Sequence, residues 1–193
     1  LNSIDVAGDY AYVANDDNVV QLQVISIAST TNPTVVATST LPNVTFTCSP
    51  PSPCLSGRSI FYYNKKVYIG TAYIANLSLP ATENNEFHIF GVTDPTNPTW
   101  EGSYNVNHNI NGIVVRKEMM GGVEKTLAYL ATSADYRELY VLDVTNPASI
   151  SELGTGFNAL GDEDGKSLYV IGNKIYLGRM DGSGSNPDSP EFH

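Results

Sequence analysis

Hydrophobic and polar residues alternate along the chain in short runs that are separated by turn-forming residues. The first two runs are residues 3–7 and 10–14, and Gly8-Asp9 lies between them. Alternation of this kind is typical of half-buried β-strands, and a Gly-Asp dipeptide between two of them predicts a hairpin. Further strands are predicted over residues 19–27 and 34–41. The first part of the chain is therefore expected to be a meander of four antiparallel strands.

The same outline recurs along the chain. A strand, an Asn-Pro corner and a second strand occur at residues 138–155, 20–40 and 87–103, with the Asn-Pro pairs at 146–147, 32–33 and 97–98. Residues 58–70 align without a gap with residues 166–178, and residues 2–14 fall in the same register. This alignment gives equivalent positions to Tyr12, Tyr68, Tyr129 and Tyr176. Self-similarity on this scale identifies a repeat protein.

The repeats predict an all-β fold, a β-propeller of four-stranded antiparallel blades with about three and a half blades present. The repeat units cover about residues 1–42, 57–106, 109–157 and 163–193 of a single domain, and the last unit is truncated. Propellers close with roughly 4 to 8 blades. We therefore expect a fragment of a longer parent protein or one part of an assembled ring. A compact sandwich of about 14 strands is less favoured, because the repeats keep their register.

Composition agrees with this prediction and narrows the functional classes. The chain has 12 Tyr, 16 Gly and 11 Pro, a mixture that suits strands and turns. Its net charge of -10 repels phosphate backbones, so nucleic acid is not an expected partner. Only 16% of the residues are charged, and Ser, Thr and Asn fill the other polar positions, as in many exported proteins. No apolar run of about 18 residues exists, so no direct membrane insertion is expected.

The two cysteines, Cys48 and Cys54, lie in a proline-rich loop. A small disulfide loop in an oxidising compartment is the favoured interpretation, and two free thiols are the alternative.

The strand and corner residues resemble the LVIVD-repeat family, a group of bacterial and archaeal propeller-like proteins of which many are secreted or found at the cell surface. The resemblance rests on Tyr-Val-Ala at 12–14, on Leu-Tyr-Val-Leu-Asp-Val-Thr-Asn-Pro at 139–147, and on residues 87–98. It covers nearly the whole chain and implies the fold and an exported prokaryotic protein, located outside the cell or on its surface. It says little about function, because the matching residues are structural.

Candidate binding residues lie in the loops at one end of the predicted propeller. In a four-stranded meander, the loop between the second and third strands lies at the same end as the connection between units, and such loops commonly carry binding sites. Arg58 and Lys166 precede equivalent serines, as Asn2 does, which could place two cations at the mouth of a central channel. His108 and Asn109 lie in a connecting loop. These four residues, Arg58, His108, Asn109 and Lys166, are the predicted ligand-binding set. The alternative is that the serines bind local backbone and the cations are solvated.

Metal binding and catalysis have weaker support. Asp181 and Asp188 could offer oxygen ligands to calcium, but the spacing matches no established calcium loop, so solvated turns are favoured. His108 would need a nucleophile or a carboxylate within reach to act as a base, and no known catalytic motif is present. No catalytic residue and no cofactor other than possible calcium is assigned.

The favoured hypothesis is therefore a non-enzymatic interaction module outside the cytoplasm, which binds a protein, a glycan or a surface polymer through its loop-rich face. One alternative is a structural subunit of a surface filament, self-assembled through the open edge of the strand at residues 174–179. Another is a propeller hydrolase or lyase that uses His108.

Overall fold

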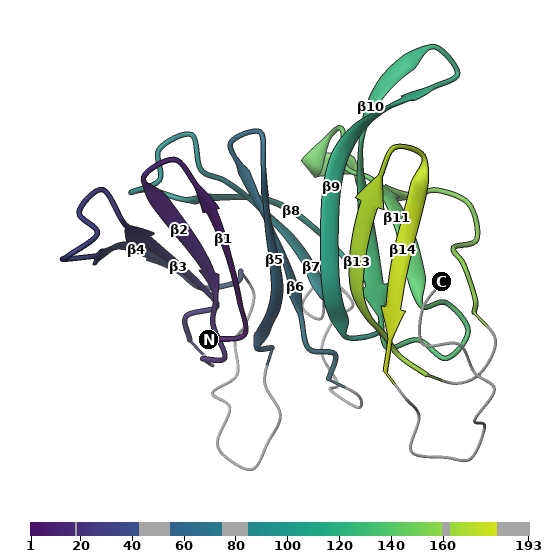
Figure 1. Cartoon of the computed structure of the whole chain (residues 1–193), viewed down its shortest axis with the longest axis horizontal. Helices are drawn as coiled ribbons and strands as arrows, with labels where there is room; N and C mark the ends of the chain where they lie inside the picture. The colour runs from purple at the N-terminus through teal and green to yellow at the C-terminus, as the bar shows by residue number, and fades with distance from the viewer. Residues whose placement is uncertain (18, 43–54, 75–84, 160–162, 181–193) are drawn as a thin grey trace.

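The computed structural model describes residues 1–17, 19–42, 55–74, 85–159 and 163–180. Within these ranges the chain forms three four-stranded antiparallel sheets and one two-stranded sheet (Figure 1). The prediction of an all-β propeller with four-stranded antiparallel blades is confirmed, with three blades complete and the fourth represented by its first two strands.

Each blade is a meander of consecutive strands. Blade 1 contains β1 (Ser3–Ala7), β2 (Tyr10–Ala14), β3 (Leu22–Ser26) and β4 (Thr34–Ser39). Blade 2 contains β5 (Gly57–Tyr63), β6 (Lys66–Thr71), β7 (Phe87–Gly91) and β8 (Thr99–Tyr104). Blade 3 contains β9 (Ile110–Met120), β10 (Val123–Thr132), β11 (Leu139–Asp143), a 3-10 turn η1 (Pro147–Ser149) and β12 (Ser151–Glu152). Blade 4 contains β13 (Gly165–Ile171) and β14 (Lys174–Arg179).

The first strands of successive blades pack side by side, in the order β1, β5, β9 and β13 (Figure 1). The hydrophobic core lies between blades, because each of its three clusters combines residues of two neighbouring blades. The aligned tyrosines explain part of this packing. Tyr12 and Tyr68 are 2% and 1% exposed, and their positions on the second strand face the adjacent blade. Each blade therefore depends on its neighbour to cover its apolar face.

The corners between the third and fourth strands correct one detail of the repeat alignment. Equivalent turns are closed by the N–H groups of Asn32, Asn97 and Ser149, which donate to carbonyls three residues earlier. Asn146-Pro147 therefore lies three residues earlier in the repeat than the other two Asn-Pro pairs, and the predicted equivalence of the three pairs is wrong. The reason is local: the side chain of Asn146 caps η1 by accepting a hydrogen bond from the backbone of Ala148, as Asp94 does for Thr96 in blade 2.

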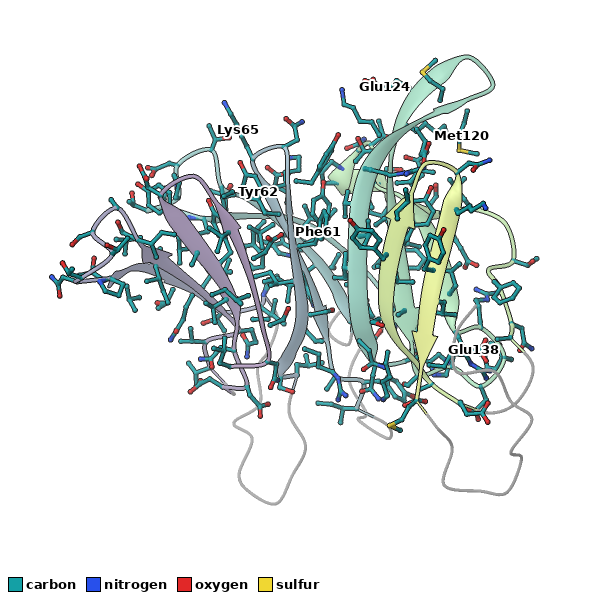
Figure 2. All side chains as sticks on the ribbon, viewed as in Figure 1. Phe61, Tyr62, Lys65, Met120, Glu124 and Glu138 are labelled. Carbon is teal, nitrogen blue, oxygen red and sulfur yellow. The ribbon has the colours of Figure 1, made fainter. Side chains whose placement is uncertain are left out.

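The two ends of the propeller differ in content. The hairpins that join the first two strands of each blade lie at one end, which includes Lys65, and Glu138 lies near the other (Figure 2). That other end collects the loops between second and third strands and the connections between blades, as expected from the meander topology (Figure 1). We call it the loop end; its described residues include 15–17, 72–74, 105–109, 133–138 and 163–164.

Candidate functional site

A β-bulge occurs at the loop end of three inner strands. In β5, Gly57 pairs with Thr71 and Ser59 pairs with Gly70, so Arg58 is the extra residue. The register shifts in the same way around Lys166 in β13 and around Asn111 in β9. A bulge removes one residue from the hydrogen-bond ladder and re-aims its side chain.

These bulges direct side chains into a cavity of about 440 Å³ at the mouth of the central axis. We call it the axial cavity. Among the described residues, its lining consists of Asn2, Asp16, Ser56, Arg58, Asn111 and Lys166. Four of them occupy the equivalent position of the four blades. The structure therefore brings Arg58 and Lys166 of the predicted set together, and it adds Asn111, which sequence comparison missed because Gly112 stands where the other units have serine.

The two asparagines are held by equivalent hydrogen bonds. Asn2 Nδ2 donates to the carbonyl of Gly57 and Asn111 Nδ2 donates to the carbonyl of Gly165, both at 2.8 Å. Each bond joins one blade to the next, so the amides are fixed in place before any ligand arrives. Ser59, in contrast, is buried and donates to the carbonyl of Ile110, so its hydroxyl serves the contact between blades.

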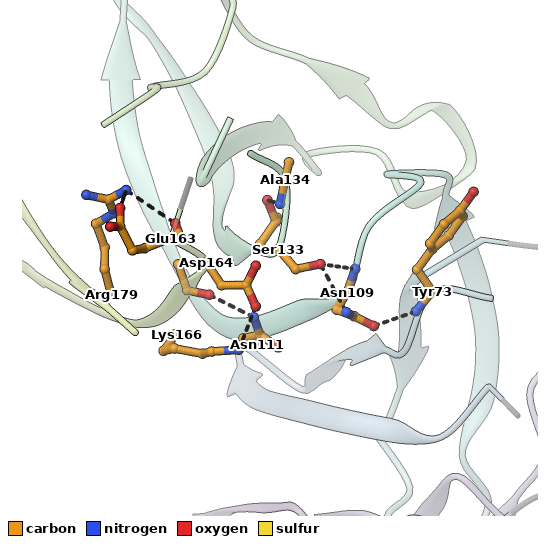
Figure 3. A network of polar contacts seen from close by, with 11 residues as sticks. Tyr73, Asn109, Asn111, Ser133, Ala134, Glu163, Asp164, Lys166 and Arg179 are labelled. Carbon is orange, nitrogen blue, oxygen red and sulfur yellow. Dashed lines mark hydrogen bonds and ion pairs between the residues drawn. The ribbon is translucent and has the colours of Figure 1, made fainter. Parts of the chain in front are cut away.

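Arg58 differs from most other cations of the protein. Seven of the ten Lys and Arg side chains form ion pairs within the described ranges, among them Lys166, whose Nζ lies 2.8 Å from Asp164 Oδ2 (Figure 3). Arg58 is half-buried and has no ion pair with any described residue. The other two such cations, Lys65 and Lys174, lie in hairpins at the opposite end. The axial cavity thus holds a guanidinium whose charge is not neutralised by an ion pair with any residue that the structure describes.

Three aromatic rings lie beside one another in the loops of blades 2 and 3. The ring of His108 is 6.1 Å from that of Tyr73 and 5.5 Å from that of Tyr136, with an edge-on contact to the latter. His108 Nε2 also lies 3.1 Å from the hydroxyl of Tyr136. Burial lowers the pKa of His108, against the opposing effect of Asp135, so a neutral imidazole is favoured. We call these three residues the aromatic ledge.

Asn109 fixes the loops that carry the ledge. Its side-chain oxygen accepts from the backbone N–H of Tyr73 at 2.9 Å, and its Nδ2 donates to the hydroxyl of Ser133 at 3.0 Å (Figure 3). The backbones of Asn109 and Ser133 are joined by a further bond of 3.1 Å. His108 and Asn109 therefore do not line the axial cavity; they build the ledge next to it. Tyr73 and Tyr136 lie in loops without repeat register, so the sequence carried no signal for them.

A second set of buried polar residues positions the loop end. Gln21, Glu86 and Glu138 directly precede the third strands and are fully buried. Each side chain accepts a hydrogen bond from the backbone that leaves the blade: from Leu41 at 3.0 Å, from Val106 and Asn107 at 2.8 and 2.9 Å, and from Ala159 at 2.9 Å. The backbone that leaves each blade is thereby fixed to the start of its third strand.

The surroundings of the two carboxylates in this set differ. Glu138 faces Arg179 at 3.4 Å, and Arg179 also pairs with Glu163 at 2.7 Å (Figure 3). Glu86 has no such cation among the described residues, and its Oε1 is buried without a hydrogen-bond partner there. Burial raises the pKa of Glu86 to about 7, against the opposing effect of its two backbone hydrogen bonds.

The remaining predicted residues cannot be placed in this site. Cys48, Cys54, Asp181 and Asp188 lie outside the described residues. Within the described ranges, no group of three or more His, Cys, Asp or Glu side chains could hold a metal ion. In the same part of the chain, no helix has the length and apolar character that crossing a membrane requires.

Comparisons with known proteins address the fold and the family. The computationally designed Ika4 protein superimposes with a TM-score of 0.56 at 9% identity, over 94% of this chain and 86% of that one. Bacteroides ovatus Xyloglucan PUL GH43B gives a TM-score of 0.48 at 15% identity, over 92% of this chain but only 34% of its own length. A search of curated proteins found no match. The LVIVD repeat matches residues 2–39, 67–106 and 128–155, which together make up more than half of the sequence. The chain therefore belongs to the LVIVD repeat family.

Proposed function

We propose that this protein is a non-enzymatic interaction module, displayed outside the cytoplasm, that binds a protein, glycan or surface polymer through its loop end. The observation that carries the proposal is the axial cavity, in which Arg58 lies without an ion pair to any described residue. A half-buried guanidinium loses part of its hydration, and a bound anion restores the lost interaction.

Two further features support a binding role. The ledge and the cavity are both built on loops and bulges that a rigid β scaffold holds in place, which is the usual arrangement of recognition sites. The low share of charged residues, 16%, supports the proposed location outside the cytoplasm.

The test is an open binding screen. The purified protein is applied to a glycan array and to a random-peptide phage library, beside a triple variant that carries Arg58→Ala, His108→Ala and Lys166→Ala. The control variant carries Lys65→Ala and Lys174→Ala at the opposite end. We expect ligands that bind the wild type and the control but not the triple variant, with all three proteins folded by circular dichroism. Ligands that the triple variant retains, or a complete lack of ligands, would contradict the proposal.

A further inference from the structure

We infer that the ligand is a glycan that presents one uronic acid next to a neutral sugar. The carboxylate of the uronic acid binds Arg58 in the axial cavity, and the neutral sugar stacks on the aromatic ledge. This inference rests on the proposed function and narrows its three partner classes to one.

The carboxylate is assigned by the cation of the cavity. Guanidinium groups bind carboxylates through two parallel hydrogen bonds, a geometry that few other side chains offer. Lys166 already has a carboxylate partner in Asp164, which leaves Arg58 as the primary anchor. A second cavity lies deeper along the axis. In each inner strand, the residue two positions after the one that lines the axial cavity is apolar and lines this second cavity; Ile4, Ile60 and Ile113 are three of these residues. A charged group is therefore kept at the polar mouth.

The hydroxyl groups of a sugar match the rest of the lining. All six described residues that line the axial cavity are polar, and its volume of about 440 Å³ suits a small ligand. Asp16 repels a second anion but accepts hydrogen bonds from hydroxyl groups, and Ser56 and the asparagines provide further partners. A peptide C-terminus also offers a carboxylate, but the described lining of the axial cavity is polar and offers no apolar wall for a peptide side chain. The lining thus favours a polyhydroxylated monoanion.

Only one anionic sugar is expected in the bound segment. The protein has a net charge of -10, and Asp16, Asp135 and Asp164 all lie at the loop end. A glycan with a charge on every ring would be repelled by these carboxylates. A single uronic acid among neutral sugars forms the ion pair with Arg58 and adds no further charge for these carboxylates to repel.

The aromatic ledge provides the second subsite. Ala72 N–H donates to the carbonyl of Ser56, a lining residue of the cavity, at 3.0 Å, so the backbone that leads into Tyr73 lies against the cavity wall. Tyr136 is 60% exposed although its ring is held against His108. The C–H face of a pyranose ring is flat and slightly positive, which suits the negative face of an aromatic ring. An exposed ring held in this way is a stacking surface beside the anion site.

Isothermal titration calorimetry with defined disaccharides tests the inference. The probes are glucuronic, galacturonic and mannuronic acid, each linked to a neutral hexose, together with the neutral counterpart of each and the free uronic acids. We expect at least one uronate disaccharide to bind about tenfold more tightly than its neutral counterpart. Arg58→Gln should abolish this preference, and Tyr136→Ala should weaken the disaccharide about fivefold but leave the free uronic acid unchanged. Lys174→Gln is the matched control and should change neither.

The outcomes separate the inference from the proposed function. If no uronate disaccharide binds better than its neutral counterpart, or if Arg58→Gln retains the preference, the inference is overturned. If peptides or neutral glycans from the screen still bind the loop end in that case, the proposed function stands. If nothing binds the loop end, both fall.

Discussion

Glu86 makes the stability of the protein depend on pH in a direction that is unusual for a carboxylate, and Glu86→Gln should remove that dependence. The side chain is fully buried; Oε2 accepts two backbone hydrogen bonds, and burial raises its pKa to about 7. Glutamine keeps an acceptor oxygen for the same two N–H groups. Blade 1 already has a glutamine at the equivalent position: Gln21 accepts the corresponding backbone hydrogen bond through its amide oxygen.

The sign of this pH dependence follows from the raised pKa of Glu86. The folded state holds the proton of Glu86 more tightly than the unfolded state, so the contribution to stability is complete below the unfolded pKa of 4.5 and is lost as pH rises through about 7. One pKa unit corresponds to about 1.4 kcal/mol, which gives a loss of ~3 kcal/mol between these limits. The variant cannot titrate at this position. Its free energy of unfolding, relative to the wild type, should therefore increase by ~3 kcal/mol from pH 4.5 to pH 8.

Urea unfolding followed by circular dichroism measures this difference at a series of pH values. All other titrating groups are shared by the two proteins and cancel in the comparison. Glu138→Gln is the matched control: it removes the charge that faces Arg179, so it should destabilise the protein at neutral pH, the opposite sign. A difference between wild type and Glu86→Gln that does not change with pH would refute the reasoning.

Three further predictions concern the framework. Gly165→Ala places a Cβ 2.7 Å from the carbonyl of Glu138 and should lower the melting temperature, with a loss of ~1–3 kcal/mol; an unchanged melting curve would count against this close approach. Arg179→Met leaves the buried carboxylate of Glu138 and the partly buried carboxylate of Glu163 without this cation and should cost ~3–5 kcal/mol in urea unfolding, whereas a neutral result would mean that these carboxylates become protonated or hydrated. Asn146→Ala removes the cap of η1 and should cost ~1 kcal/mol, and full stability of this variant would show that the proline alone holds the corner.

Much of the fold could be predicted because the first hairpins of blades 1, 2 and 4 repeat without insertions, and only that of blade 3 is extended. The period-2 pattern and the aligned tyrosines located the inner strands, and the residue before the equivalent serines identified Arg58 and Lys166 as neighbours at the axis. The corner between the third and fourth strands was harder to predict. Asn-Pro pairs form this turn in all three blades, but in blade 3 the pair lies three residues earlier in the repeat.

The missed residues lie where the repeats differ in length. Glu86 and Glu138 follow loops of unequal length, so their equivalence with Gln21 was hidden although each precedes a buried strand. Tyr73 and Tyr136 each contact His108 through the packing of loops around Asn109. Contacts of that kind depend on tertiary structure and leave no periodic signal.

The bulges at residues 58, 111 and 166 have an evolutionary consequence. A residue outside the ladder carries no share of strand pairing, so its identity can change by a single codon while the blade remains intact. Arginine, asparagine and lysine already occupy these three positions of one ring. Selection can therefore change the side chains at the axial cavity one blade at a time, and a library randomised at these codons would vary the cavity while the strand pairing of each blade is kept.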